Sequence, residues 1–254
     1  MSKNSESFHE KGFCIYRKLL DRDTVEGLLR EADRLHALGF GHRSTINEPP
    51  VKWLVTGTPD APILRGLQNG YRISNLLERV RTHPSVYTAI EPLVGQAITT
   101  IAQSLFWKPP GEHDTMIAYH QDAVFRKPRE SFRNIDVSYI QCGIALDPHG
   151  PENGGMKFVL GSHRLGDLSI ERTHSVMQES IEVFDLEAYG LSRSDEIDVE
   201  LEPGDMVVWH PYLLHGSPPN DSRVIDRRFL VCGYMRTADC DTGVPAFEAG
   251  RPVH

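Results

Sequence analysis

The chain has 254 residues, with 27 Lys and Arg against 35 Asp and Glu, and its formal net charge at pH 7 is −8. This acidic balance argues against nonspecific nucleic-acid binding and against docking on anionic lipid, because both require a basic face. No stretch comes near the roughly 18 apolar residues of a membrane span, and the polar N-terminus, MSKNSESFHEKG, lacks the apolar core of a signal peptide. We therefore expect neither a nucleic acid nor a membrane as a partner.

The four cysteines, Cys14, Cys142, Cys232 and Cys240, include no pair at the CxxC spacing of a zinc knuckle. Cys142 and Cys232 lie within apolar runs, which is typical of buried small hydrophobic side chains. A chain of this length buries enough surface to fold without disulfides. These features favour a reducing compartment, and we expect the protein to be cytoplasmic.

The first third of the sequence predicts a mixed, partly helical region. Residues 12–16 predict a short strand, and Asp21 or Asp23 can cap a helix whose apolar positions recur at helical spacing. Two further short helices are predicted at residues 73–80 and 85–94.

Residues 41–70, in contrast, are rich in Gly, Pro and Thr and show no steady period, so they predict a loop. This loop contains Trp53, and we interpret it as a candidate lid over a site.

From about residue 97 the sequence becomes strand-like, with Gly, Pro and Asp between short apolar runs. The predicted strands are residues 98–107, 137–146, 156–160, 197–201, 206–210 and 229–235. Several short strands separated by turns predict an antiparallel sandwich or barrel. The stretch 165–193 is polar and predicts an insertion with some helix.

The expected fold class is therefore mixed α+β and mainly β, in one domain over residues 1–254. Residues 1–96 would form a mainly helical part, residues 97–237 the β core, and residues 238–254 an irregular tail.

The pattern that carries chemistry is His120-Gln121-Asp122, followed by His215 93 positions after Asp122. Two imidazoles and one carboxylate form the facial triad of non-haem iron(II), which leaves coordination positions open for other molecules. Residues i and i+2 of a strand point to the same face, so His120 and Asp122 can reach one ion. His210 competes with His215 as the distal ligand, and we favour His215, which lies where an apolar run ends in a turn.

These residues resemble the phytanoyl-CoA dioxygenase family, a branch of the iron(II)/2-oxoglutarate oxygenases built on a double-stranded β-helix. The resemblance is carried by ordered motifs over most of the chain. They are LFWKPPG at 105–111, HQD at 120–122, PENGGM at 151–156, GSH at 161–163, and the segment from Gly204 through His215-Gly216-Ser217 to Ser222.

The resemblance implies that His120, Asp122 and His215 ligate iron(II), and that 2-oxoglutarate and dioxygen are co-substrates. It also implies an arginine that pairs with the far carboxylate of 2-oxoglutarate, since a guanidinium donates two parallel hydrogen bonds to a carboxylate. The family's usual spacing falls on Asp226, so the arginine is either Arg227 or Arg228. Only one of the two can point inward from a strand, and we favour Arg227.

Four further residues of the matching motifs are assigned to the co-substrate: Ser217, Gln121, Ser104 and Lys108. Gly143 falls near it as well. Many relatives have a larger side chain there, so the resemblance implies a pocket that is roomier or filled differently.

The segment after the HQD motif, RKPRESFR at 126–133, carries four positive charges in an otherwise acidic chain. It predicts a small, anionic substrate, with Arg126, Arg129 and Arg133 at the mouth of the site. Tyr119 and Trp107 are candidates for the pocket wall.

The expected function is hydroxylation of an unactivated carbon in a small metabolite, which is amino-acid-like, a phosphonate or a natural-product intermediate, with release of succinate and carbon dioxide. Asp122 disfavours halogenation, because related halogenases lack the ligand carboxylate. Three alternatives remain open at this point: desaturation, cyclisation or epimerisation at the same site; a cupin-type metal oxygenase or isomerase without 2-oxoglutarate; and a catalytically silent binding module.

Overall fold

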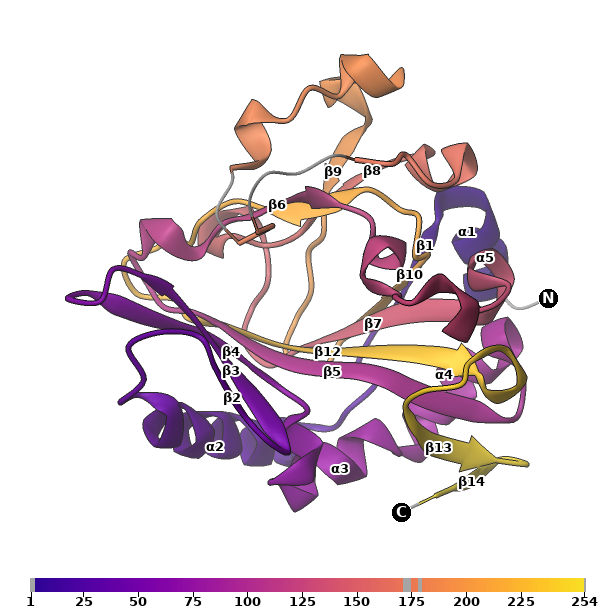
Figure 1. Ribbon diagram of the computed structural model, residues 1–254, viewed down its shortest axis with the longest axis horizontal. Coiled ribbons are helices and arrows are strands. Elements are labelled where there is room, and N and C mark those ends of the chain that lie inside the picture. The colour runs from indigo at the N-terminus through magenta and orange to yellow at the C-terminus, as the bar shows by residue number, and fades with distance from the viewer. Residues whose placement is uncertain (1–2, 171–174, 178–179, 254) are drawn as a thin grey trace.

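Two antiparallel sheets face each other in this protein, whose computed structural model describes residues 3–170, 175–177 and 180–253. The large sheet runs in the order β1 (Phe13–Tyr16), β10 (Met206–Trp209), β7 (Tyr139–Ala145), β12 (Arg227–Arg236), β5 (Ile98–Lys108), β4 (Pro62–Gln68), β3 (Val51–Gly57), β2 (Ile46–Glu48). The small sheet runs in the order β6 (Ile117–His120), β11 (His215–Ser217), β8 (Lys157–Val159), β9 (Glu196–Asp198). Figure 1 shows the small sheet above the large one. This is the predicted mixed, mainly β, cupin-like architecture.

Helices cover the outer face of the large sheet (Figure 1). They are α2 (Arg22–Gly39), α3 (Asn75–Arg81) and α4 (Pro84–Val94), while α1 (Lys3–Lys11) and α5 (Ile135–Ser138) lie at the side of the molecule. Asp21 caps α2 by accepting a hydrogen bond from the backbone N–H of Thr24, as the sequence predicted. Among the described residues, no helix is long and apolar enough to cross a membrane.

Strand alternation divides the side chains of the large sheet between two environments. On β12, Leu230 and Cys232 point to the helices and join the main hydrophobic core. Arg227, Phe229 and Val231 point the other way, towards the small sheet, where they line a cavity. The same alternation places Trp107 of β5 in the core beneath α2, next to His36.

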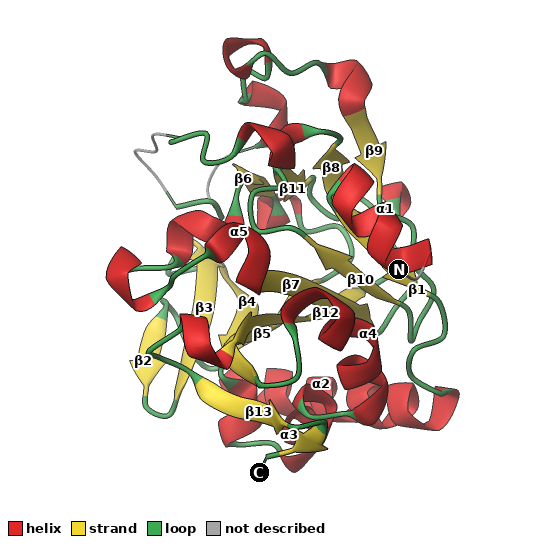
Figure 2. Cartoon of the chain, turned by 90° about the vertical axis from the view of Figure 1, so that its right-hand side faces the viewer, coloured by secondary structure: helices red, strands yellow, loops and turns green. Residues whose placement is uncertain are grey.

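Residues 41–70 do not form the predicted loop. They contribute β2, β3 and β4, and β4 pairs with β5, so the large sheet is extended beyond its expected edge (Figure 2). Trp53 is buried on β3 and packs in the main core, so it belongs to no lid. The run from Val51 to Val55 is rich in strand-forming residues, but the surrounding Gly and Pro hid this signal.

The tail is also more regular than predicted, because β13 (Val244–Glu248) pairs with β5 and with β14 (Arg251–Pro252). The polar stretch between β8 and β9 contains short 3-10 turns at Ile181–Val183 and Glu187–Tyr189, in agreement with an insertion of limited helix content.

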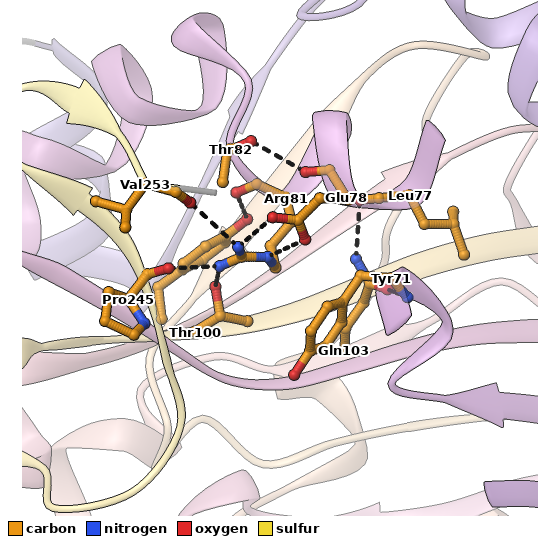
Figure 3. A network of polar contacts seen from close by, with 10 residues as sticks. Tyr71, Leu77, Glu78, Arg81, Thr82, Thr100, Gln103, Pro245 and Val253 are labelled. Carbon is orange, nitrogen blue, oxygen red and sulfur yellow. Dashed lines mark hydrogen bonds and ion pairs between the residues drawn. The ribbon is translucent and has the colours of Figure 1, made fainter. Parts of the chain in front are cut away.

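A buried arginine joins helix α3 to the C-terminal strands (Figure 3). Arg81 is 1% exposed, and its Nε donates to the Glu78 carboxylate at 2.7 Å. It also donates to Thr100 Oγ1 at 3.1 Å and to the carbonyl oxygens of Pro245 at 3.0 Å and Val253 at 3.4 Å. One side chain thus fixes the positions of α3, β5 and the tail.

The Arg81→Ala change should lower the free energy of unfolding by about 2–4 kcal/mol, because it leaves several buried acceptors without a donor. Arg34→Ala is the matched control. Arg34 pairs with Glu31 at the same i,i+3 spacing, but its side chain is 54% exposed, and its removal should cost no more than about 0.5 kcal/mol. Denaturant titrations of both variants measure the difference, and equal losses would contradict the role given to burial.

Candidate metal centre

The small sheet brings the two distant halves of the predicted metal site together. β11 pairs with β6 so that His215 lies directly opposite His120. Asp122 follows β6 in a single 3-10 turn, and one ligand atom from each of the three residues lies within 4.8 Å of the others. His215 Nε2 is 3.3 Å from Asp122 Oδ2, and His120 Nε2 is 3.9 Å from Asp122 Oδ1. All three side chains are buried.

Hydrogen bonds around the triad orient each candidate ligand. His120 Nδ1 lies 2.8 Å from the carbonyl oxygen of Ala118, and His215 Nδ1 lies 2.8 Å from that of Leu213. A carbonyl can only accept, so each Nδ1 carries a proton and each Nε2 is turned towards Asp122, where it would be the ligand atom for a metal. Trp209 Nε1 donates to Asp122 Oδ2 at 2.8 Å. Two imidazole nitrogens and one carboxylate, held in this way, fit the donor set of non-haem iron(II).

The Asp122 carboxylate is held in its ionised form. Burial raises its pKa, but the combined effect of His215, His120, Arg126 and the Trp209 hydrogen bond is larger and lowers the pKa below its usual value. A charged carboxylate is the form that binds a metal.

The competing histidine, His210, lies outside this cluster. Its Nε2 lies 2.8 Å from the carbonyl oxygen of Asp136, and its Nδ1 accepts from the Tyr212 backbone N–H at 3.1 Å. Both ring nitrogens are therefore used by neighbouring backbone.

A cavity of about 550 Å³ opens beside the triad, between the two sheets. Its charged lining residues are Lys52, Asp122, Arg126 and Arg227. Ser104 and Ser217 also line it, while Phe106, Phe229 and Val231 form an apolar wall. Such a mainly apolar cavity with a few convergent polar groups is typical of a small-molecule site.

Arg227 lies at the centre of a buried group of cations. Arg65 and Lys108 are each 1% exposed and Arg227 is 2% exposed. Burial and the nearby charge of Arg65 lower the pKa of Arg227 to about 9, although Asp147 opposes this shift. Within the described part of the chain, Arg227 Nε has no hydrogen-bond partner. A buried cation without a partner is costly, so the site is electrostatically suited to an anion.

The other two cations of this group are bound by protein oxygens. Arg65 donates to the carbonyls of Asp114 and Thr115 at 2.6 and 2.7 Å. Lys108 Nζ donates to Ser217 Oγ at 2.6 Å and to the carbonyls of Gly154 and Pro218. Because Ser217 accepts from Lys108, its own hydroxyl proton is available to the cavity. Lys108 thus lies behind Ser217 rather than in the lining.

Two residues assigned to the co-substrate point elsewhere. Arg228 faces away from the cavity, where it forms ion pairs with Asp147 at 2.7 Å and Asp33 at 2.6 Å. Gln121 donates to the carbonyls of Gly166 and Tyr212 and accepts from the Leu168 N–H. These bonds anchor a loop, and Gln121 is absent from the cavity lining, so a contact with the co-substrate is not supported.

Only one of the five residues proposed for the substrate lies in the cavity, namely Arg126. Arg129 pairs with Asp167 at 2.8 Å and Arg133 with Asp241 at 2.8 Å, both on the surface. Tyr119 packs against Phe184 on the far side of the small sheet, and Trp107 is a core residue, as described above. Strand alternation explains why Tyr119 and Trp107 face away from the cavity, since the next residue of Tyr119, His120, and the preceding residue of Trp107, Phe106, both line it.

The structure adds site residues that the sequence analysis missed. The space above Gly143 is filled by Phe229, since a Cβ at Gly143 would lie 2.1 Å from the Phe229 ring. Trp209 orients Asp122, and Lys52 reaches the cavity from β3, within the stretch predicted as a loop. Cross-strand contacts of this kind leave no local signal in a sequence.

Known proteins with similar sequences are oxygenases. The chain is 30% identical over 149 residues to the methylphosphonate hydroxylase of Gimesia maris, a match that spans 59% of this chain and 50% of that enzyme. It is 22% identical over 243 residues to a probable alpha-ketoglutarate-dependent hypophosphite dioxygenase of Stutzerimonas stutzeri, with 92% of this chain and 78% of that protein covered. The chain thus spans only half the length of the first of these relatives.

Similar folds occur in solved structures. The non-haem alpha-ketoglutarate-dependent epimerase SnoN from nogalamycin biosynthesis superposes with a TM-score of 0.68 at 20% identity, over 99% of this chain and 94% of that one. EctD from S. alaskensis with bound Fe gives a TM-score of 0.73 at 16% identity, over 99% and 80% of the two chains.

By its family and its relatives in sequence, the protein is an iron- and 2-oxoglutarate-dependent dioxygenase. More specifically, the chain belongs to the phytanoyl-CoA dioxygenase family, whose sequence profile, described as "Phytanoyl-CoA dioxygenase (PhyH)", matches residues 8–229. The predicted family, enzyme class and cofactors are thereby confirmed, and the alternatives of a 2-oxoglutarate-independent enzyme and a silent binding module are disfavoured.

The Trp209→Phe change should weaken iron(II) binding by about 10- to 100-fold, because it removes the N–H group that orients Asp122. Trp53→Phe is the matched control, since Trp53 is equally buried and also donates its indole N–H to a carboxylate, that of Glu48 at 3.1 Å. Anaerobic competition with a chromophoric chelator measures both affinities. Equal affinities in the two variants would contradict the orienting role.

His210 should make stability fall as the pH is lowered. The pKa of His210 is lowered from 6.5 to about 4, mainly because the side chain is buried. Between pH 6.5 and pH 4, His210 binds a proton in the unfolded chain but not in the folded chain. Acidification therefore favours unfolding, and the stability that is present above pH 6.5 is lost as the pH falls towards 4. For metal-free protein, the free energy of unfolding should change less between pH 7 and 5 in His210→Gln than in the wild type. Parallel pH profiles would contradict this assignment.

Proposed function

We propose that this protein hydroxylates an unactivated carbon of a small anionic metabolite, with 2-oxoglutarate and dioxygen as co-substrates. His120, Asp122 and His215 would hold iron(II). When bound, iron(II) would let dioxygen, the oxidant, react with both organic molecules, so that one oxygen atom converts 2-oxoglutarate to succinate and carbon dioxide and the other converts the substrate C–H bond to an alcohol. The protein's contribution is to position both organic molecules and to exclude water.

The observation that carries this proposal is the buried guanidinium of Arg227 in the same cavity as the triad. A dicarboxylate that reaches the metal with its 2-oxo acid end would place its far carboxylate on Arg227 and on the hydroxyl of Ser217. Arg227 would then donate two parallel hydrogen bonds, which offset a buried charge whose Nε has no hydrogen-bond partner among the described residues. Lys108 would keep Ser217 in position through the 2.6 Å hydrogen bond to its oxygen.

Apolar side chains would shield the co-substrate from water. Phe229 fills the space above Gly143, and its ring centre lies 5.7 Å from the Arg227 guanidinium carbon. A dry environment strengthens the interaction between the guanidinium and a carboxylate.

The remaining charges of the cavity support an anionic substrate. If Asp122 binds the metal and Arg227 the co-substrate, the charged residues left in the lining are two cations, Lys52 and Arg126. The names of two relatives, a methylphosphonate hydroxylase and a probable hypophosphite dioxygenase, agree with a small phosphorus-containing anion. The epimerase SnoN shares the fold, so epimerisation at this site is the second candidate reaction.

The Arg227→Met change should raise the dissociation constant of 2-oxoglutarate on the order of 100-fold, because the buried salt bridge is lost. Arg228→Met is the matched control. It should leave this constant unchanged and lower the free energy of unfolding by about 1–3 kcal/mol, since Arg228 pairs with Asp147 and Asp33 instead. The visible charge-transfer band of the anaerobic iron(II) protein reports 2-oxoglutarate binding. An unaltered titration of Arg227→Met would disprove the proposed role.

A further inference from the structure

The cavity has a second polar end, far from Arg227. β12 and β7 run antiparallel along its floor, with Phe229 opposite Ala145 and Gly233 opposite Gln141. Arg227 and Gly233 are six residues apart on β12, which corresponds to about 20 Å along an extended strand. The candidate co-substrate site and Gln141 therefore lie towards opposite ends of the same floor.

Three polar groups at this second end have no hydrogen-bond partner among the residues that the structure describes. They are Arg126 Nε, the Tyr139 hydroxyl and Gln141 Oε1; the Arg126 guanidinium acts on the Tyr139 hydroxyl at short range, but without a hydrogen bond of ordinary geometry. Tyr139 is 1% exposed and Gln141 is 5% exposed. Buried polar groups are nearly always hydrogen-bonded in folded proteins, so three such groups in one place indicate a ligand site.

These groups lie together for a structural reason. Tyr139 and Gln141 are two residues apart on β7 and therefore share a face of the sheet. The Arg126 guanidinium lies over the Tyr139 ring, with its central carbon 5.2 Å from the ring centre. Arg126 and Gln141 both line the cavity.

The Gln141 amide occupies the space above Gly233, the residue opposite it on β12. A Cβ atom at Gly233 would lie 2.6 Å from Gln141 Oε1 and 3.3 Å from the Tyr139 ring. Any larger residue at Gly233 would displace the Gln141 amide, so glycine lets this amide lie against β12, next to the Tyr139 ring.

Arg126 also differs from the other arginines of its segment. The Arg129 and Arg133 guanidinium groups are bound by the carboxylates of Asp167 and Asp241. Arg126 interacts electrostatically with Asp122, a member of the candidate metal triad. Once Asp122 binds a metal, the charge of Arg126 is left for another anion.

We propose that Arg126, Tyr139 and Gln141 form a distal subsite that binds the oxyanion group of the substrate, a carboxylate, phosphate or phosphonate. This inference rests on the proposed function, because it assigns the substrate's anchor at the same site. Nε–H and one terminal N–H of Arg126 donate in parallel to two oxygens of the anion, and the Tyr139 hydroxyl donates to one of them. The Gln141 amide, turned over relative to this structure, donates its N–H groups to the anion. The carbon to be oxidised then lies between this anchor and the metal.

The test uses anaerobic protein loaded with iron(II) and saturated with 2-oxoglutarate, so that the triad and Arg227 are already engaged. Methylphosphonate and propionate are the two probes, and calorimetry measures their binding. At least one probe should bind the wild type. Arg126→Met and Gly233→Ala should each weaken that binding at least tenfold. Arg129→Met removes the same charge from the same segment and should leave the affinity unchanged.

The outcomes separate the distal subsite from the proposed function. Absence of the charge-transfer band in the wild type would contradict the proposed function itself. If the band is normal in the wild type and all variants, two results would overturn the subsite alone. One is that neither probe binds the wild type, and the other is that a probe binds the wild type and Arg126→Met equally well. Equal weakening in Arg126→Met and Arg129→Met would also overturn it, since general charge attraction would then explain binding. Preference for methylphosphonate or for propionate distinguishes a tetrahedral from a planar oxyanion.

Discussion

The site depends on the antiparallel pairing of β11 with β6, which places His215 opposite His120. A shift of one residue in this register would turn one imidazole to the other face of the small sheet. Backbone hydrogen bonds of the strands therefore set the distance between side chains that are far apart in the sequence. The carbonyls of Ala118 and Leu213 and the indole of Trp209 then fix the direction in which each candidate ligand points. Two of the three candidate ligands are thus held by the small sheet, and Asp122 is held in the 3-10 turn that follows β6.

The large sheet supplies the complementary half of the cavity through strand alternation. One face of β12 carries Arg227, Phe229 and Val231 towards the metal triad, while the other face packs under the helices. The buried positive charge of Arg227 has little compensation from the protein, so the free enzyme carries an electrostatic cost that an anion would remove. The network around Arg81 shows the contrast (Figure 3): that guanidinium is equally buried, but it is bound by a carboxylate and by backbone oxygens. Burial of arginine thus serves stability at Arg81, whereas at Arg227 it serves the ligand binding that we propose.

The sequence predicted the architecture well where each strand or helix has a local signal. The capping residue of α2, the helices α3 and α4, and the long strand β5 were all apparent from periodicity and turn residues. The predicted loop at residues 41–70 was wrong, because β2, β3 and β4 are stabilised by pairing with one another and with β5, which the local sequence does not reveal. The same limit applies to the site. Arg129, Arg133 and Tyr119 looked suitable by type and position, but their actual partners lie on other segments.

The sequence by itself determined the ligand types, their order along the chain and the resemblance to an oxygenase family, because these depend on residue identity and spacing. It also limited the co-substrate arginine to two neighbouring positions. Only the tertiary structure decided that Arg227 faces the cavity and Arg228 the ion pair with Asp147, since the phase of β12 relative to the small sheet fixes which side chains point inward. The unpaired polar groups of Arg126, Tyr139 and Gln141 likewise became visible only after folding, because whether a buried group lacks a partner depends on every segment packed around it.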